Sequence, residues 1–225
     1  MDLTKDFIKT KRPCADGFRW FLRHHHEGSN YQDLLDALVQ AGRVSDACWL
    51  LDQFGPTNET LILDHLSADA IVFAGSLRVR GNIDVDSVVR VGRRIDVGGS
   101  IVVGESLVSG DDIRCEGIVR INGRLESGGR LKAGWGIEAN GGITAKAALQ
   151  AAWNVQCAGH LRLGGQASVG QDISVRGSIT CSKSLVCGGS LVSTDSVHAV
   201  EGISVGLNIQ CGMHLEAGWG IKAGG

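Results

Sequence analysis

The stretch GNIDVDSVVRVGRRIDVGGSIVVG, from Gly81 to Gly104, decides the fold because it reads as four consecutive units of six residues. In each unit the third and fifth places are apolar, as in Ile83 and Val85, and the residue between them is often charged, as in Asp84. Side chains two residues apart on an extended backbone point the same way. Each unit is therefore predicted to be a very short strand with two inward side chains, followed by a bend.

The same frame runs through residues 75–224 without a break, which gives 25 units. The third place is Ile, Leu or Val in every unit except the one that holds Ala167, and the fifth place never carries a charge. Gly, Asn, Asp and Ser crowd the sixth, first and second places, where the chain must turn and positive backbone angles are tolerated. Such strands bury little alone, but successive coils can hydrogen-bond to one another as a parallel β-solenoid. The predicted fold is mainly β, a parallel β-helix with a hexad repeat and three faces.

With three units per coil, roughly eight coils that rise about 4.8 Å each would form a rod of about 40 Å. Trp135 and Trp153 occupy the same place in units that are three apart, which predicts that they stack on one corner. A flattened coil of two units stays open as an alternative, because the phrase GWGI begins at Gly134 and again at Gly218. That spacing equals fourteen units, which is a whole number of two-unit coils but not of three-unit coils. A duplication requires only whole units, so three faces are favoured.

Residues 1–60 have no six-residue period and are predicted to form a small N-terminal α-helical domain that caps the first coil, with the solenoid over residues 61–225. Ile71 is already in phase with the units that follow. Three segments place apolar residues at helical spacing. These residues are Phe18, Phe21 and Leu22, then Leu34, Leu35 and Leu38, then Ala47, Leu50 and Leu51.

Residues that begin and end helices flank these segments. Ser29 or Asn30, and Ser45, fit helix N-caps, and Gly42 and Gly55 fit helix ends. Three or four short helices packed on one another are expected.

Composition and short motifs limit the class of protein. No stretch is apolar for long enough to cross a bilayer, and the N-terminal MDLTKDFIKTKRP does not read as a signal peptide. The expected location is the cytoplasm, with no membrane partner. The seven cysteines form no CxxC pair, so neither a disulfide framework nor a zinc ribbon is expected.

No catalytic, cofactor-binding or metal-binding residue is expected. Adjacent side chains in His24–His26 point in different directions, and their interaction with a helix C-terminus explains them without a metal. The glycine pair Gly98 and Gly99 lies between strands with no helix after it, so nucleotide binding is not expected. The remaining candidates have structural interpretations. Cys115, Cys157, Cys181, Cys187 and Cys211 occupy the inward fifth place, and His160, His198 and His214 occupy outward places.

Charge gives no sign of a nucleic-acid partner. The segment 1–60 holds seven Lys and Arg against nine Asp and Glu, and the remainder holds 15 against 15. Binding to nucleic acid needs a basic face. Folding could still gather charges of one sign on one face. In a coil of three units, Arg78, Asp96, Arg114 and Lys132 would be successive rungs of one ladder.

Trp135, Trp153 and Trp219 are the candidate binding residues. Aromatic residues exposed at corners are frequent interface anchors. The alternative interpretation is that each one shields a bend or the edge of a neighbouring coil.

The units GNIDVD, GSIVVG and GSITCS resemble the strand units of bactofilins, which are polymer-forming bacterial cytoskeletal proteins. The resemblance covers residues 75–225 and implies a three-faced, right-handed β-helix that joins end to end. The left-handed hexapeptide acyltransferases place the small inward residue before the large one, whereas Ile83 precedes Val85 here. In the head, CADGFRWFL and ACWLLDQ resemble segments of proteobacterial and phage proteins of unassigned function.

The sequence therefore predicts a non-enzymatic cytoplasmic scaffold or protein-binding solenoid with a protein partner. Association into a homo-oligomer through a solenoid edge is expected, because an open strand edge invites pairing. The alternative function is a phage or mobile-element inhibitor of a host defence complex, for instance an anti-CRISPR protein, that acts by protein contact.

Overall fold

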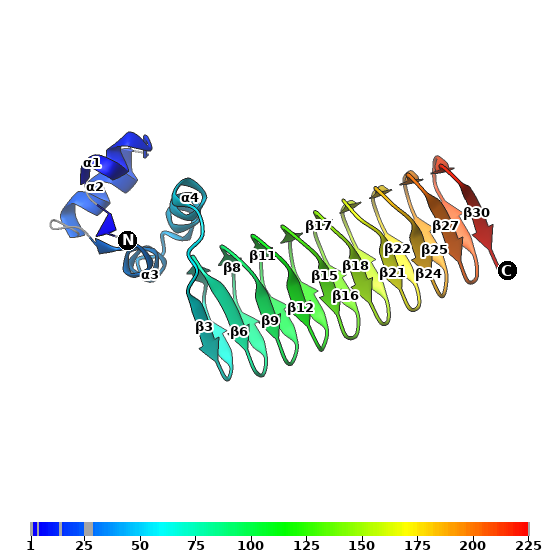
Figure 1. Cartoon of the computed structure of the whole chain (residues 1–225), viewed down its shortest axis with the longest axis horizontal. Coiled ribbons are helices and arrows are strands. Elements are labelled where there is room, and N and C mark those ends of the chain that lie inside the picture. Colours follow the sequence, from blue (N-terminus) through cyan, green and yellow to red (C-terminus); the bar gives the residue numbers. More distant parts are fainter. Residues whose placement is uncertain (1, 4, 14, 25–28, 225) are drawn as a thin grey trace.

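The structure, a computed structural model, describes residues 2–3, 5–13, 15–24 and 29–224 as a helical head followed by a long β-solenoid (Figure 1). The helices of the head are α1 (Lys5–Thr10), α2 (Ala15–His24), α3 (Tyr31–Gln40) and α4 (Val44–Phe54). A short antiparallel pair, β1 (Asp2–Leu3) with β2 (Ser29–Asn30), joins two segments of the head. The apolar residues predicted from helical spacing all contribute to the core of the head.

Most of the predicted helix ends are confirmed. Asn30 is the N-cap of α3, where its side chain accepts a hydrogen bond from the Gln32 amide. Gly42 and Gly55 follow α3 and α4 with positive φ angles of 70° and 77°. The prediction for Ser45 is wrong, because α4 begins at Val44 and its N-cap position is Arg43, which makes no side-chain cap.

The solenoid has three parallel sheets, which form its three faces. The first face contains β3 (Thr60–Leu63), β6 (Ser76–Val79), β9 (Ile95–Val97), β12 (Ile113–Cys115), β15 (Leu131–Ala133), β18 (Leu149–Ala151), β21 (Ala167–Val169), β24 (Leu185–Cys187), β27 (Gly202–Val205) and β30 (Gly220–Ala223). The second contains β4 (Leu66–Ala68), β7 (Ile83–Val85), β10 (Ile101–Val103), β13 (Val119–Ile121), β16 (Ile137–Ala139), β19 (Val155–Cys157), β22 (Ile173–Val175), β25 (Leu191–Ser193) and β28 (Ile209–Cys211). The third contains β5 (Ile71–Phe73), β8 (Val88–Val91), β11 (Ser106–Ser109), β14 (Leu125–Ser127), β17 (Ile143–Ala145), β20 (Leu161–Leu163), β23 (Ile179–Cys181), β26 (Val197–Ala199) and β29 (Leu215–Ala217).

The pairing register confirms three units per coil and makes the two-unit alternative wrong. Leu125 pairs with Ile143, and Ile143 pairs with Leu161. The first coil is shorter, since Leu61 pairs with Leu77 and Leu66 pairs with Ile83. The frame that begins at residue 75 describes the later coils.

Third and fifth places point inward along the whole solenoid. In β12, Ile113 and Cys115 are fully buried while Arg114 between them is exposed. These inward side chains form one continuous hydrophobic core from Leu66 to Val205. Burial of alternate residues on strands too short to be stable alone is what holds successive coils together.

Close packing of the coils, and not positive backbone angles, explains most of the corner glycines. Among the described solenoid residues only Gly220 has a positive φ, of 141°. A Cβ atom on Gly128 would lie 1.8 Å from the carbonyl oxygen of Gly110, one coil earlier. Glycine at such a corner allows two backbones to approach.

The head packs against the third face at its first strand. The outer side of β5 is covered by α3 and α4, so that Val72 and Ala74 join the core of the head. Gln32 fixes this contact, because its side-chain amide donates to the Val72 carbonyl at 3.0 Å and accepts from the Ala74 amide at 2.9 Å. The inward residues Leu61 and Leu63 of the first coil are only partly buried. The head thus lies beside the first coil and does not enclose all of its core.

Within the described part of the chain, none of the helices is both long and apolar enough to traverse a lipid bilayer.

Candidate interaction surfaces on the solenoid corners

The first place of each unit lies on a corner between two faces, and the residues at one corner of successive coils form a column along the rod. We call the corner between the first and second faces the first corner, and the next two in chain order the second and third corners. On the first corner the Trp135 amide donates to the Gly117 carbonyl at 3.2 Å, and the Trp153 amide donates to the Trp135 carbonyl at 3.1 Å. The backbone therefore holds corner side chains at a regular spacing.

Trp135 and Trp153 stack on the first corner, as predicted. Their ring centroids are 5.7 Å apart and their planes differ by 11°. The side chains remain 59% and 52% exposed, so the stack covers one face of each ring and leaves an apolar surface in solvent. Solvent-exposed, ordered aromatic rings are suited to contact a partner.

Trp219 does not join this pair, because it lies on the third corner. It belongs to a coil, residues 207–224, that carries a large apolar residue on every corner. These residues are Leu207 on the first, Met213 on the second and Trp219 on the third, and they are 51%, 65% and 79% exposed. We call these three residues the apolar collar. It was missed in the sequence, although the consecutive units LNIQCG, MHLEAG and WGIKAG all begin with large apolar residues.

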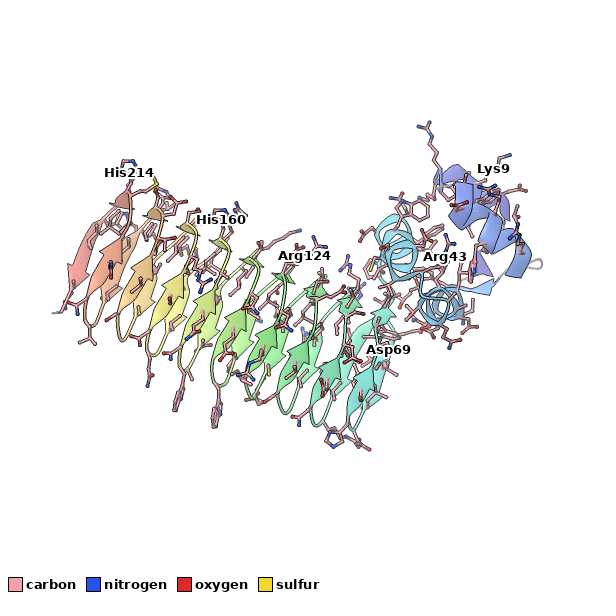
Figure 2. The ribbon with its side chains drawn as sticks, turned by 180° about the vertical axis from the view of Figure 1, so that it is seen from behind. Lys9, Arg43, Asp69, Arg124, His160 and His214 are labelled. Carbon is pink, nitrogen blue, oxygen red and sulfur yellow. The ribbon has the colours of Figure 1, made fainter. Side chains whose placement is uncertain are left out.

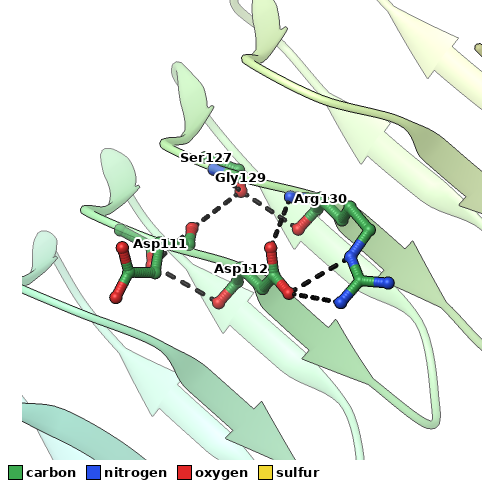
Figure 3. Close-up of polar contacts among 6 residues, drawn as sticks. Asp111, Asp112, Ser127, Gly129 and Arg130 are labelled. Carbon is green, nitrogen blue, oxygen red and sulfur yellow. Dashed lines mark hydrogen bonds and ion pairs between the residues drawn. The ribbon is translucent and has the colours of Figure 1, made fainter. Parts of the chain in front are cut away.

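Second-place side chains satisfy the backbone of the next coil. Asp112 Oδ1 accepts from the Arg130 amide at 2.7 Å, and Asp112 Oδ2 accepts from the Arg130 guanidinium at 3.0 Å (Figure 3). The hydrogen bond from the Arg130 backbone, with the nearby guanidinium, holds the pKa of Asp112 below its usual range despite partial burial. The same bond between successive coils joins Asn82 Oδ1 to the Ser100 amide, Asn154 Oδ1 to the Asp172 amide and Asp172 Oδ1 to the Ser190 amide. Asn and Asp at this place therefore stabilise the stacking of coils.

Inward serines and cysteines bind corner carbonyl groups. Ser127 Oγ donates to the Asp111 and Arg130 carbonyls at 3.0 and 3.1 Å (Figure 3). Cys115 Sγ lies 3.0 Å from the Gly99 carbonyl in the same geometry, and burial raises the pKa of this thiol to about 11. Equivalent contacts to a carbonyl of the preceding coil are made by Cys157, Cys181, Cys187 and Cys211. The structural interpretation of these cysteines is confirmed, with a hydrogen bond added to their packing role.

The outward histidines are distributed along the rod and are not gathered at one site. Arg124, His160 and His214 lie along one long edge, which is the second corner (Figure 2). His160 Nδ1 is 2.8 Å from Ser178 Oγ, and His198 Nδ1 on the third face is 3.2 Å from Glu216 Oε2. In the candidate cluster at His24–His26, His25 and His26 lie outside the described residues, as does the side chain of His24. The described residues contain no group of three His, Cys, Asp or Glu side chains arranged to hold a metal ion.

The head contains a partly open cavity of about 180 Å³. Apolar and aromatic side chains line most of it, including Trp20, Phe21 and Trp49. Its carboxylate, Asp46, accepts a hydrogen bond from Arg43 Nε at 2.6 Å. The cavity therefore offers mainly apolar surface between packed helices.

Positive and negative charges are balanced along the sequence, but folding gathers several arginines on one part of the first face. The predicted ladder is confirmed, since Asp96 pairs in register with Arg78 and with Arg114, and Arg114 pairs with Lys132. Four further arginines lie at the borders of this part of the first face: Arg80, Arg93, Arg94 and Arg130. From β18 to β27 on the same face the outward residues are uncharged: Gln150, Ser168, Val186 and Ser204. The charged and uncharged parts of the first face are thus separate surfaces.

Comparison with known proteins matches the head to a protein family. Residues 1–55 match the family model of the YdhT N-terminal domain. No curated protein matches the chain, and no solved structure matches it either. The match to residues 1–55 does not extend to the solenoid, so the likeness to bactofilins has no support from these comparisons. The chain is therefore a three-faced β-solenoid whose helical head is similar to the YdhT N-terminal domain.

Proposed function

We propose that the chain is a non-enzymatic cytoplasmic scaffold that associates with a second copy of itself through the coil of residues 207–224. The observation that carries the proposal is the apolar collar. Leu207, Met213 and Trp219 expose large apolar side chains on all three corners of one coil. Exposed apolar residues that gather in one place are typical of protein contacts, whereas single ones are ordinary.

The strands of the same coil add a reason for self-association. In the described residues β28, β29 and β30 each pair with another strand on one side only. The inward Ile209 and Leu215 are only partly buried, and Ile221 is 46% exposed. A second copy offers the same rows of N–H and C=O groups and the same apolar surface, so a two-fold arrangement is self-complementary. This arrangement agrees with the end-to-end joining that the bactofilin resemblance implies.

The non-catalytic part of the proposal is supported by the roles of the outward polar side chains. Asp112 and Asp172 bind the backbone of the next coil, and His198 is paired with Glu216. These groups are engaged in holding the coils together. The inhibitor of a host defence complex has no specific observation in its favour and stays a hypothesis.

The test is sedimentation of the full-length protein over a wide concentration series. Wild-type protein should shift to a dimer as concentration rises, by mass action. The triple variant Leu207→Gln, Met213→Gln, Trp219→Gln should remain a monomer. The matched control, Trp135→Gln with Trp153→Gln, removes exposed aromatic surface elsewhere and should still associate. A wild-type protein that is monomeric at every concentration would overturn the proposal, as would a control variant that also fails to associate.

A further inference from the structure

Two shallow grooves on the first face, next to the head, are lined by arginine side chains. They have volumes of about 370 and 300 Å³ and share Arg78, Arg94 and Asp96 in their linings. The larger groove also contains Arg80 and Arg114, and the smaller one contains Arg93. We call the two grooves together the arginine groove.

Arg80 and Arg114 form ion pairs with Asp64 and Glu116, whereas the other three arginines of the arginine groove are incompletely neutralised. The side chain of Arg94 makes no hydrogen bond or ion pair with the described residues, although its charge helps lower the pKa of Asp112. Arg78 and Arg93 lie 3.9 Å from carboxylates of Asp96 and Asp111, at the outer limit of an ion pair. Exposed ion pairs of that length contribute little. The groove therefore retains positive charge that an anionic ligand would neutralise.

Carboxylates within the groove limit the kind of anion it fits. Asp96, Asp111 and Glu116 line it between the arginines. They interrupt the cationic surface, and a nucleic-acid backbone with a phosphate at every step would meet like charge there. A peptide can place its carboxylates with gaps between them. Arginine forks bind carboxylates through paired hydrogen bonds, and they project here from coils about 4.8 Å apart.

We propose that the arginine groove binds a carboxylate-rich segment of a partner protein. This inference adds a partner to the proposed scaffold. It uses a surface on the first face beside the head, whereas self-association uses residues 207–224, so either proposal can fail without the other. Arg78 and Arg94 would bind carboxylates of the acidic partner on this rigid face. The neighbouring aspartates would repel carboxylates placed opposite them, and so favour partners whose carboxylates are spaced apart.

The test measures binding of a fluorescently labelled peptide of alternating Glu and Gly to the full-length protein, by anisotropy. A peptide of alternating Gln and Gly is the uncharged control probe. The double variant Arg78→Gln, Arg94→Gln should weaken binding by at least about tenfold, or about 1.4 kcal/mol, because the peptide carboxylates lose charge-assisted hydrogen bonds to both guanidinium groups. The matched variant Arg120→Gln, Arg124→Gln changes the net charge equally on other surfaces and should alter binding less than about twofold.

A further variant gives an effect of opposite sign. Asp96→Asn removes a carboxylate from the groove and should tighten binding of the Glu peptide, because like-charge repulsion is lost. Circular dichroism and thermal melting verify that each variant is folded. Absence of peptide binding, equal loss in the two arginine variants, or tighter binding of a single-stranded oligonucleotide than of the Glu peptide would each overturn the inference.

Discussion

Individual side chains of the solenoid act through the backbone of the neighbouring coil. On the outer side of the coil, the Asp112 carboxylate accepts a hydrogen bond from the Arg130 amide. On the inner side, the Ser127 hydroxyl donates a hydrogen bond to the Asp111 carbonyl. Corner backbone groups would otherwise lack partners when coils stack, and an unpaired buried polar group is costly. The preference for Asn, Asp and Ser at the bends is therefore a hydrogen-bonding requirement between coils as well as a turn propensity.

The lowered pKa of Asp112 predicts a pH-dependent contribution to stability. A carboxyl group with a folded pKa below its unfolded value stabilises the protein above the unfolded pKa, which is about 3.9, and loses that effect as pH falls through the folded pKa. At neutral pH, Asp112→Asn should lower the free energy of unfolding by about 1 kcal/mol or less, and the difference should vanish in strong acid. Urea titrations at several pH values measure it, with Asp84→Asn on the second face as control. A difference that persists unchanged in acid would contradict the assignment.

Each strand depends on its inward residues, and its outward residue is free to vary. Leu131 is fully buried between Ile113 and Leu149, while Lys132 beside it is exposed. Because inward and outward residues alternate, one strand contains both a core position and a surface position with almost the same backbone. The structure therefore permits surface columns as different as the arginine groove and the uncharged residues beyond it.

Neighbouring substitutions in β15 should separate these two roles. Leu131→Ala should destabilise the protein by about 2–5 kcal/mol through lost burial and a cavity. Lys132→Ala should change the free energy of unfolding by less than about 0.5 kcal/mol. Chemical denaturation of both variants measures the contrast. Comparable effects from the two would mean that this strand does not point Leu131 inward.

The six-residue period was sufficient to predict the inward residues, because they depend only on spacing along the chain. A coil of three units, and with it the stacking of Trp135 on Trp153, was favoured over a coil of two units, and the strand register decides between them. The start of α4 was not predicted, since Arg43 contacts Asp46 and Ser45 makes no cap. The apolar collar is visible only when first-place residues are compared across a whole coil. Docking of Gln32 onto β5 leaves no periodic signal, because it joins segments that are far apart in the sequence.

At the scale of the whole molecule, the head and the solenoid are joined by a small number of specific contacts. Gln32 bonds two backbone groups of the first coil, and Asp52 on α4 pairs with Arg90 on the third face at 2.7 Å. The arginine groove lies over β6, β9 and β12 near this junction. The coil of residues 207–224, which carries the apolar collar, lies at the far end of the rod from the head (Figure 1). A scaffold of this shape would keep a bound acidic partner distant from the self-association surface.

Gln32→Ala should loosen the head from the solenoid while the solenoid itself remains folded. The substitution leaves the Ala74 amide without its side-chain partner and should make local opening easier by about 1–3 kcal/mol. Hydrogen exchange of the α3 and α4 amides measures this opening. Gln53→Ala, at an exposed position of α4, is the matched control. Unchanged exchange in Gln32→Ala would mean that the docking rests on other contacts.

The constant register also determines how the rod can change in length. Deleting three units would leave every later side chain on its own face, whereas deleting one unit would keep the interior intact and rotate the later exterior by one face. Deleting a single residue would turn the interior outward. The two GWGI phrases show the effect of a shift by whole units that is not a whole number of coils. The second phrase begins four coils and two units after the first, so Trp219 lies on a different corner from Trp135. Copying whole hexads thus generates new combinations of surface residues on an unaltered core.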